Sequence, residues 1–197
     1  MTPSPATASS RLWLVRHAAP LVAPGTCYGA LDVPADAQAT RAAAERLATA
    51  LPPGARVAHS TLQRCELLAH DLQALRPDLT FAPDARLREM DFGRWEGQTW
   101  DAIGKSAIDA WVAGFATHAP GGGESLAHML HRVAAALQTA REWRNDQGTM
   151  DVVWITHAGV ARCVAWLQER GESALPRSED WPAAAPGWGE WEIRELA

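Results

Sequence analysis

The sequence contains few cysteines, and their spacing excludes a disulfide-stabilised fold. Cys27, Cys65 and Cys163 are the only three, none belongs to a Cys-x-x-Cys pair, and an odd number leaves at least one thiol unpaired. Proteins that stay reduced inside the cell have this pattern, whereas small secreted domains are rich in cysteine. We therefore expect a cytoplasmic protein without a disulfide framework.

Long hydrophobic runs are absent as well. No stretch approaches the roughly 20 apolar residues that a membrane-spanning helix needs, which excludes an integral membrane protein. The N-terminal residues are rich in Pro, Ser, Thr and Ala and lack the charged and apolar segments of a signal peptide, so we expect a disordered lead-in over 1–10. Repeats and long linkers are also missing, and the 197 residues fit one domain over 1–197.

Basic residues are too few for a nucleic-acid-binding protein. Lysine and arginine total 18 against 23 aspartates and glutamates, which gives a formal net charge of −5. Lys105 is the only lysine, so almost every cation is a planar guanidinium suited to a carboxylate or a phosphate. A general bias toward arginine explains that average, and each arginine must be judged by its position. We expect a small-molecule partner, no nucleic acid and no membrane.

Apolar runs that alternate with helical patterns predict the fold class. Short apolar segments indicate buried strands, and we expect them near residues 12–15, 56–60, 79–81, 151–156 and 188–194. Apolar residues at helical spacing indicate helices over 37–51, 60–72, 125–144 and 160–167, the first of them capped by Asp36. This alternation predicts an α/β protein, a three-layer α/β/α sandwich with a mostly parallel central sheet. Residues 82–124 show neither pattern, and we expect an irregular segment there.

Three of the predicted strands end in residues that suit an anion. Arg16 and His17 follow the first strand, Ser60 and Arg64 follow the second, and His157 follows the strand over 151–156. The carboxyl ends of parallel strands meet at one edge of a sheet, where ligands bind in such folds. Two arginines and two histidines that face one point destabilise a protein unless an anion joins them. The pattern therefore predicts a phosphate site at this edge.

Phosphoryl transfer at such a site requires a nucleophile, donors for the phosphate oxygens and an acid for the leaving oxygen. A neutral imidazole is a competent nucleophile. Arginine forks bind phosphate oxygens in pairs, and a protonated carboxylic acid can supply the proton.

Four segments resemble the signature motifs of the histidine phosphatase superfamily, which includes the cofactor-dependent phosphoglycerate mutases. The segments are Val15–His17, Ser60–Cys65, Leu87–Gly97 and Thr156–Val160. They are similar, in that order, to R-H-G, S-x-L-x-R-C/A, L-x-E-x-x-F-G-x-W-E-G and T/S-H-G/A-G. Their order and separations also match, and the resemblance extends from about Arg11 to the last predicted strand. It implies a phosphoglycerate mutase-like fold.

The resemblance implies catalytic roles for five residues. His17 is implied to accept the phosphoryl group and Glu89 to donate the proton, while the phosphate oxygens are bound by Arg16, Arg64 and His157.

Two neighbours of Glu89 are alternatives for the proton donor, because Asp91 and Glu96 lie close in sequence. The implied chemistry needs no metal or other cofactor, and the sequence shows no H-E-x-x-H motif or Cys/His ligand spacing.

Three further segments are similar to one subgroup, the alpha-ribazole phosphatases. They are Gly25–Pro34, Leu62–Ala69 and Pro120–Ser125, which resemble G-x-C-Y-G-x-x-D-x-P, L-x-R-C-x-x-L-A and P-G-G-E-S with one extra glycine. The resemblance implies removal of the 5′-phosphate of alpha-ribazole phosphate in adenosylcobalamin biosynthesis.

The substrate pocket is expected to include Cys27, Tyr28 and Gly29. Residues 90–124 are expected to form a cap, in which some of the tryptophans Trp95, Trp100 and Trp111 cover the pocket and stack on a flat leaving group such as a benzimidazole.

Departures from the motifs keep alternatives open. Ala18 replaces the glycine that usually follows the first histidine, which is the one feature favouring a non-catalytic phosphate-binding module. The loop over 18–36 lacks the asparagine of the mutases, which weighs against a mutase. Ala30 and Leu31 replace a polar pair of the alpha-ribazole subgroup, so a broad-specificity phosphatase also remains an alternative. The sequence leaves the oligomeric state open, a homodimer included.

Overall fold

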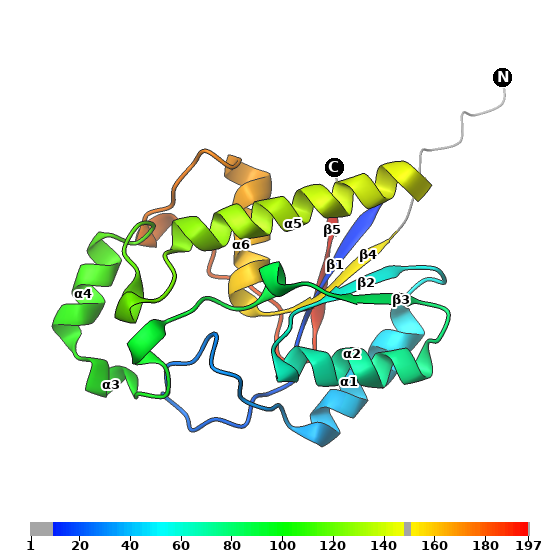
Figure 1. Cartoon of the computed structure of the whole chain (residues 1–197), viewed down its shortest axis with the longest axis horizontal. Coiled ribbons are helices and arrows are strands. Elements are labelled where there is room, and N and C mark those ends of the chain that lie inside the picture. The colour runs from blue at the N-terminus through cyan, green and yellow to red at the C-terminus, as the bar shows by residue number, and fades with distance from the viewer. Residues whose placement is uncertain (1–9, 148–150, 197) are drawn as a thin grey trace.

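A five-stranded sheet runs through the centre of the protein, whose computed structural model describes residues 10–147 and 151–196 (Figure 1). In sheet order the strands are β3 (Thr80–Pro83), β2 (Arg56–His59), β4 (Val152–Thr156), β1 (Arg11–Arg16) and β5 (Trp191–Glu195). The first four run parallel, and β5 pairs antiparallel with β1. The expected mostly parallel sheet is therefore confirmed.

The central strands are buried on both faces, which explains why their sequences are continuous apolar runs. In β1, Leu12 and Leu14 point into one core, and Trp13 and Val15 point into the other. All five residues of β4 are buried. Alternate side chains of the same strand thus fill two separate cores, because successive residues face opposite sides of a sheet.

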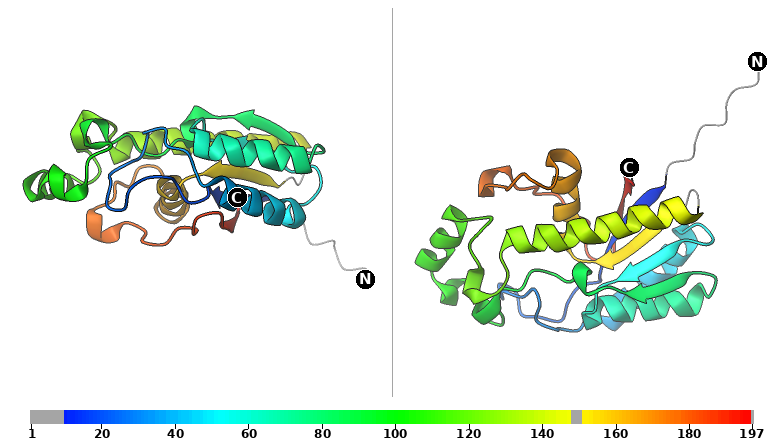
Figure 2. Two further views of the ribbon diagram at one scale, coloured as in Figure 1. Left: turned by 90° about the horizontal axis from the view of Figure 1, so that it is seen from below. Right: turned by 45° about the horizontal axis from the view of Figure 1, so that its top comes forward.

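Four helices cover the two faces and complete the expected α/β/α sandwich (Figures 1 and 2). On one face, α1 (Ala37–Ala50) packs against α2 (Gln63–Leu75), and on the other α5 (Leu126–Gln147) packs against α6 (Ala158–Arg170). Asp36 caps α1 as expected, since its Oδ1 accepts a hydrogen bond from the Ala39 N–H at 2.7 Å.

The segment between β3 and α5 is more regular than its sequence predicts. It contains α3 (Trp100–Ile103), α4 (Lys105–Ala113) and the 3-10 turns η1 (Ala85–Leu87), η2 (Gly93–Trp95) and η3 (Pro120–Gly122). None of the α4 residues is buried, and α4 spans only nine residues, so its apolar positions are too few for a clear helical pattern in the sequence. Figure 2 shows α3 and α4 together at one end of the molecule, away from the sheet.

Two other expectations need correction at their boundaries. The helix after β2 begins at Gln63 and not at Ser60, because its N-cap residue Leu62 has an extended backbone and the Gln63 N–H is bound by Asp32 Oδ1 at 2.8 Å. Of the expected lead-in over 1–10, residues 1–9 lie outside the described residues, and Ser10 is buried.

The loop between α6 and β5 contains a further turn, η4 (Ser178–Asp180). Within the described residues, no helix combines the length and the apolar character of a membrane span.

Candidate active site

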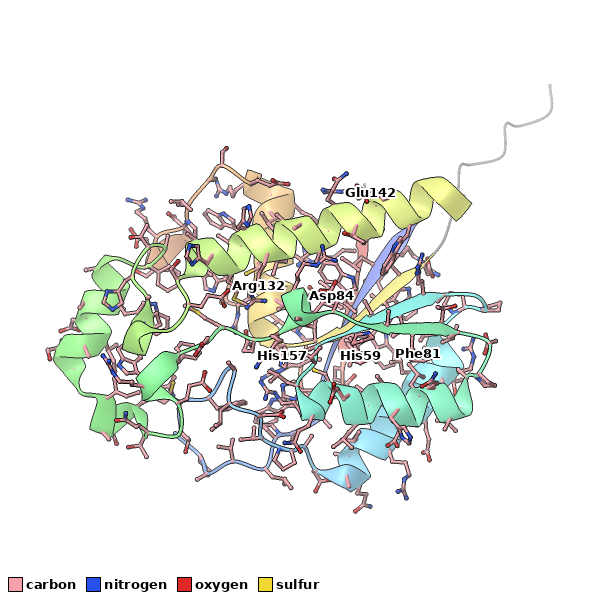
Figure 3. All side chains as sticks on the ribbon, viewed as in Figure 1. His59, Phe81, Asp84, Arg132, Glu142 and His157 are labelled. Carbon is pink, nitrogen blue, oxygen red and sulfur yellow. The ribbon has the colours of Figure 1, made fainter. Side chains whose placement is uncertain are left out.

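The carboxyl ends of β1, β4 and β2 meet, and they bring together residues that are far apart in the sequence. The His17 N–H donates to the Thr156 carbonyl at 3.1 Å, and the Ser60 N–H donates to the Ile155 carbonyl at 2.9 Å. The rings of His17 and His157 consequently lie 5.1 Å apart, with an angle of 60° between their planes. Figure 3 shows His157 just beyond β4, near the centre of the molecule.

His17 is held as a neutral imidazole with one nitrogen free. Its Nδ1 lies 2.6 Å from the Ala18 carbonyl oxygen, and because a carbonyl can only accept, Nδ1 carries the proton and Nε2 keeps its lone pair. Burial lowers the pKa of His17 to about 3, and the positive charges of Arg64 and Arg16 act in the same direction. Ala18 participates through its backbone, so its extra methyl group leaves this contact intact.

His157 lies next to His17 and is buried. Its Nε2 is 2.8 Å from Ser60 Oγ and 3.5 Å from Cys65 Sγ, whereas no partner within the described part of the chain faces its Nδ1. Burial lowers the pKa of His157 well below its ordinary value, reinforced by Arg64 and His17. A second neutral imidazole therefore adjoins the first.

Arg64 is a fully buried cation that forms no salt bridge among the residues the structure describes. Its Nη1 donates to the Leu31 carbonyl at 2.9 Å and its Nη2 to the Gly29 carbonyl at 2.5 Å, and its Nε has no partner there. The Tyr28 ring centroid lies 5.7 Å from its Cζ. A buried charge without a counter-ion is costly, so this site is built for an anion that the protein itself does not supply.

Glu96 fixes the loop that holds Arg64. Its carboxylate accepts hydrogen bonds from the N–H groups of Gly29 at 3.2 Å, Ala30 at 2.8 Å, Phe92 at 2.9 Å and Leu31. A carboxylate with four backbone donors is fully engaged. Glu96 therefore has a structural task, which separates it from the other two candidate proton donors.

Glu89 and Asp91 also differ in position. Glu89 Oε2 accepts from the Gly159 N–H at 3.0 Å and its Oε1 from the Met90 N–H at 3.1 Å, and it lines the same cavity as His17. Asp91 accepts from the Gly93 N–H at 2.7 Å and does not line this cavity. Among the three carboxylates, only Glu89 faces the cavity.

A half-buried network that the sequence does not predict holds the backbone around Glu89. Arg132, on α5, donates to the carbonyls of Arg86 and Arg88 at 2.7 Å each and to that of Glu89 at 3.3 Å (Figure 3). The same guanidinium binds both oxygens of Glu124, at 2.7 and 2.8 Å. The sequence offers no spacing that connects these residues, because two distant segments, residues 86–89 and 124–132, supply them.

The cavity has a volume of about 380 Å³ and two chemically different parts. Its polar wall is formed by Arg16, His17, Tyr28, Arg64, Glu89 and Arg162. Its apolar wall contains five aromatic residues, namely Phe92, Trp100, Trp111, Phe115 and Trp181. A molecule with an anionic end and a flat apolar end matches this division.

The aromatic wall is centred on Trp111. Its ring lies parallel to that of Trp100, at 6.4 Å and 7°, and edge-on to those of Phe92 and Trp95. Trp100 and Trp111 thus line the cavity, while Trp95 supports them from outside it. The sequence does not predict the contributions of Phe115 and Trp181, since Trp181 comes from the loop after α6.

Two of the three expected pocket residues occupy other positions. Tyr28 lines the cavity, whereas Cys27 is completely buried and Gly29 contributes its carbonyl to Arg64. Within the described residues, no cluster of three or more His, Cys, Asp or Glu side chains is arranged to hold a metal ion.

Comparison with known proteins gives the family. The profile of the histidine phosphatase superfamily (branch 1) matches residues 12–184. No curated protein matches the sequence.

Solved structures show the same architecture over almost the whole chain. The mycobacterial glucosyl-3-phosphoglycerate phosphatase is similar with 29% identity and a TM-score of 0.73, over 94% of this chain and 90% of the other. A protein from Thermus thermophilus is similar with 29% identity and a TM-score of 0.63, over 93% and 92%. A candidate alpha-ribazole-5′-P phosphatase from Escherichia coli K-12 shares the fold, with 22% identity and a TM-score of 0.74 over 94% and 90%.

The profile match, the phosphatases among the structural neighbours and the cationic cavity lead to the same conclusion. The chain belongs to branch 1 of the histidine phosphatase superfamily and is a phosphoric monoester hydrolase.

Proposed function

We propose that the protein hydrolyses alpha-ribazole 5′-phosphate through a phosphohistidine formed on His17. One observation carries the mechanism: the Nδ1–H of His17 is bound to the Ala18 carbonyl, which leaves the lone pair on Nε2, and Arg64 is a buried cation without a salt bridge in the described part of the chain. A neutral nucleophile next to an anion site is what attack on a phosphate dianion requires.

The first step transfers the phosphoryl group to the enzyme. Nε2 of His17 attacks phosphorus, the N–P bond forms and the bond between phosphorus and the ester oxygen breaks. The carboxylic acid of Glu89 gives its proton to the departing oxygen. Arg16 and Arg64 line the cavity and bind the non-bridging oxygens, where their N–H groups neutralise the phosphate charge. The family resemblance implies the same role for His157, which adjoins His17 but does not itself line the cavity.

The second step restores the enzyme. The Glu89 carboxylate takes a proton from water, the oxygen of that water attacks phosphorus and the N–P bond breaks. Inorganic phosphate leaves, His17 regains its lone pair and Glu89 is again protonated.

The aromatic wall supports the choice of leaving group. Trp100 and Trp111 present flat, apolar surface within the cavity that holds His17, and aromatic rings bind one another by offset or edge-on contact. The benzimidazole of alpha-ribazole is such a group, and the three segments similar to the alpha-ribazole subgroup agree with it. A broad-specificity phosphatase is the second candidate, favoured by Ala30 and Leu31 in place of a polar pair.

The remaining expectations become part of the same proposal. We propose one histidine phosphatase domain over residues 1–197, with residues 90–124 as the cap over the substrate. The supporting observation for the cap is that Phe92, Trp100 and Trp111 line the cavity from this segment. Three unpaired, buried cysteines support a cytoplasmic location. The catalytic chemistry uses no metal or cofactor, and a small phosphomonoester is the proposed partner.

A comparison of two substrates tests the leaving-group assignment. The kcat/KM for alpha-ribazole 5′-phosphate should exceed that for ribose 5-phosphate, which lacks the base, by about 10-fold or more, given ~1 kcal/mol for each aromatic contact. Trp111→Ala should reduce this preference and spare ribose 5-phosphate. Equal kcat/KM values for the two substrates favour the broad-specificity candidate. Val112→Ala, a truncation of the exposed neighbour, is the matched control.

A further inference from the structure

The segment Pro186–Glu190, just before β5, lies directly behind the two residues at the end of β1. The Arg16 N–H donates to the Glu190 carbonyl at 3.0 Å. The Gly189 N–H donates to the carbonyls of both Arg16, at 3.1 Å, and His17, at 3.0 Å. The backbone that carries the proposed nucleophile is therefore held by a part of the chain that none of the four sequence motifs includes.

The same segment also contacts the guanidinium of Arg16. Its Nη1 donates to the Pro186 carbonyl at 3.1 Å, and its Cζ lies 5.2 Å from the centroid of the Trp188 ring. Arg16 forms no salt bridge within the described residues, and its Nε has no partner there. The Pro186 carbonyl thus occupies one edge of the Arg16 guanidinium, and the Trp188 ring lies within cation–π range of it. Arg16 itself lines the cavity.

Trp188 is 52% exposed, so the hydrophobic core does not explain its position. Its neighbour Gly189 is fixed independently. Gly189 has a φ of +71°, a Cβ there would lie 3.2 Å from the Cβ of Ala43 on α1, and its carbonyl accepts from Arg46 at 2.9 Å. The segment is therefore anchored to α1, and Trp188 is held beside Arg16 by its backbone.

We propose that Trp188 is a positioning residue for Arg16. Arginine has several rotatable bonds, and ordering it on the substrate costs conformational entropy. A ring beside the guanidinium and a carbonyl on one edge restrict it beforehand, so that its remaining N–H groups face the phosphate. This inference rests on the proposed phosphate-binding role of Arg16.

A double-mutant cycle measured with orthovanadate, a phosphate mimic, tests the coupling. We expect Trp188→Ala to weaken vanadate binding by about two- to tenfold, the range of a partly exposed cation–π contact. Trp188→Phe keeps an aromatic face and should restore most of the affinity, whereas Trp188→Leu should not. In an Arg16→Ala background, Trp188→Ala should have no further effect, because its partner is already gone. Ile193→Ala, an exposed apolar truncation on β5, is the control and should bind normally.

The outcomes separate this inference from the proposed function. If Arg16→Ala weakens vanadate binding but Trp188→Ala does not, Trp188 has no positioning role and the phosphate site stands. Equal losses from Trp188→Ala in both backgrounds also overturn the inference, since they indicate a general structural effect. If Arg16→Ala leaves vanadate affinity unchanged, the role of Arg16 itself is wrong, and the inference fails with it.

Discussion

Substitution of Gly159 by alanine should displace the proposed proton donor without removing it. A Cβ at position 159 would lie 2.1 Å from Oε1 of Glu89 and 2.9 Å from its Cδ, whereas ordinary van der Waals contact begins at 3.4 Å. The carboxylate must therefore move by roughly 1 Å or more, and a misplacement of about 1 Å can cost a catalytic group ~10²-fold in rate. General acid catalysis contributes ~10²–10⁴-fold in total, so a loss of about 10²-fold lies within what a displaced proton donor can cost.

The choice of substrate makes this prediction specific. In a single turnover, Gly159→Ala should slow phosphoryl transfer from an alkyl ester such as ribose 5-phosphate by about 10²-fold. Transfer from p-nitrophenyl phosphate should change far less, because that leaving group departs without a proton. Glu89→Gln should give the same pattern. Gly54→Ala is the matched control, since Gly54 has a φ of +73° and a Cβ at this position would meet no atom within 4 Å, so its substitution affects stability alone. Equal slowing of both substrates would refute the reasoning.

Two further predictions concern the support of the site and its response to pH. Glu96→Gln should lower the free energy of unfolding by about 1–3 kcal/mol and weaken phosphate binding, because the loop that holds Arg64 loses its charged acceptor. Chemical denaturation measures the stability and titration calorimetry the phosphate binding, with the exposed Glu66→Gln as the control. The pKa of His17 is lowered to about 3 in the folded protein, so between its unfolded value near 6.5 and pH 3 only the unfolded state binds this proton. The contribution of neutral His17 to the free energy of unfolding is therefore complete above about pH 6.5 and decreases by up to ~1.4 kcal/mol per pH unit below it. Urea unfolding at a series of pH values should show this decrease. A His17→Asn variant whose stability changes with pH by the same amount would contradict the prediction.

Much of the site is predictable from the sequence because strand order and short motifs determine it locally. Arg16 ends β1, and His17 and His157 come directly after buried strands, so a parallel sheet is sufficient to bring them together. Arg64 lies in the first turn of α2, and that helix could be recognised from its apolar spacing. For these residues, local sequence and general topology are enough.

Other parts depend on contacts between distant segments, for which a single sequence carries no signal. Glu96 is distinguished from Glu89 by the backbone N–H groups it meets, and three of these belong to a loop more than 60 residues earlier. Trp181 reaches the aromatic wall from the loop after α6, and Trp188 reaches Arg16 from before β5. Such partners are determined by tertiary packing and not by periodicity.

The central claim is that the phosphoryl group passes through His17, and a rapid-quench experiment tests it most directly. With ³²P-labelled substrate, quenching within one turnover should yield labelled protein whose phosphate is stable to alkali, labile to acid and located on His17. The label should be absent from His17→Ala, which should release no phosphate, while His70→Ala, an exposed histidine on α2, should behave as the unaltered protein. Phosphate release without labelled protein at any time, together with turnover by His17→Ala, would contradict the account.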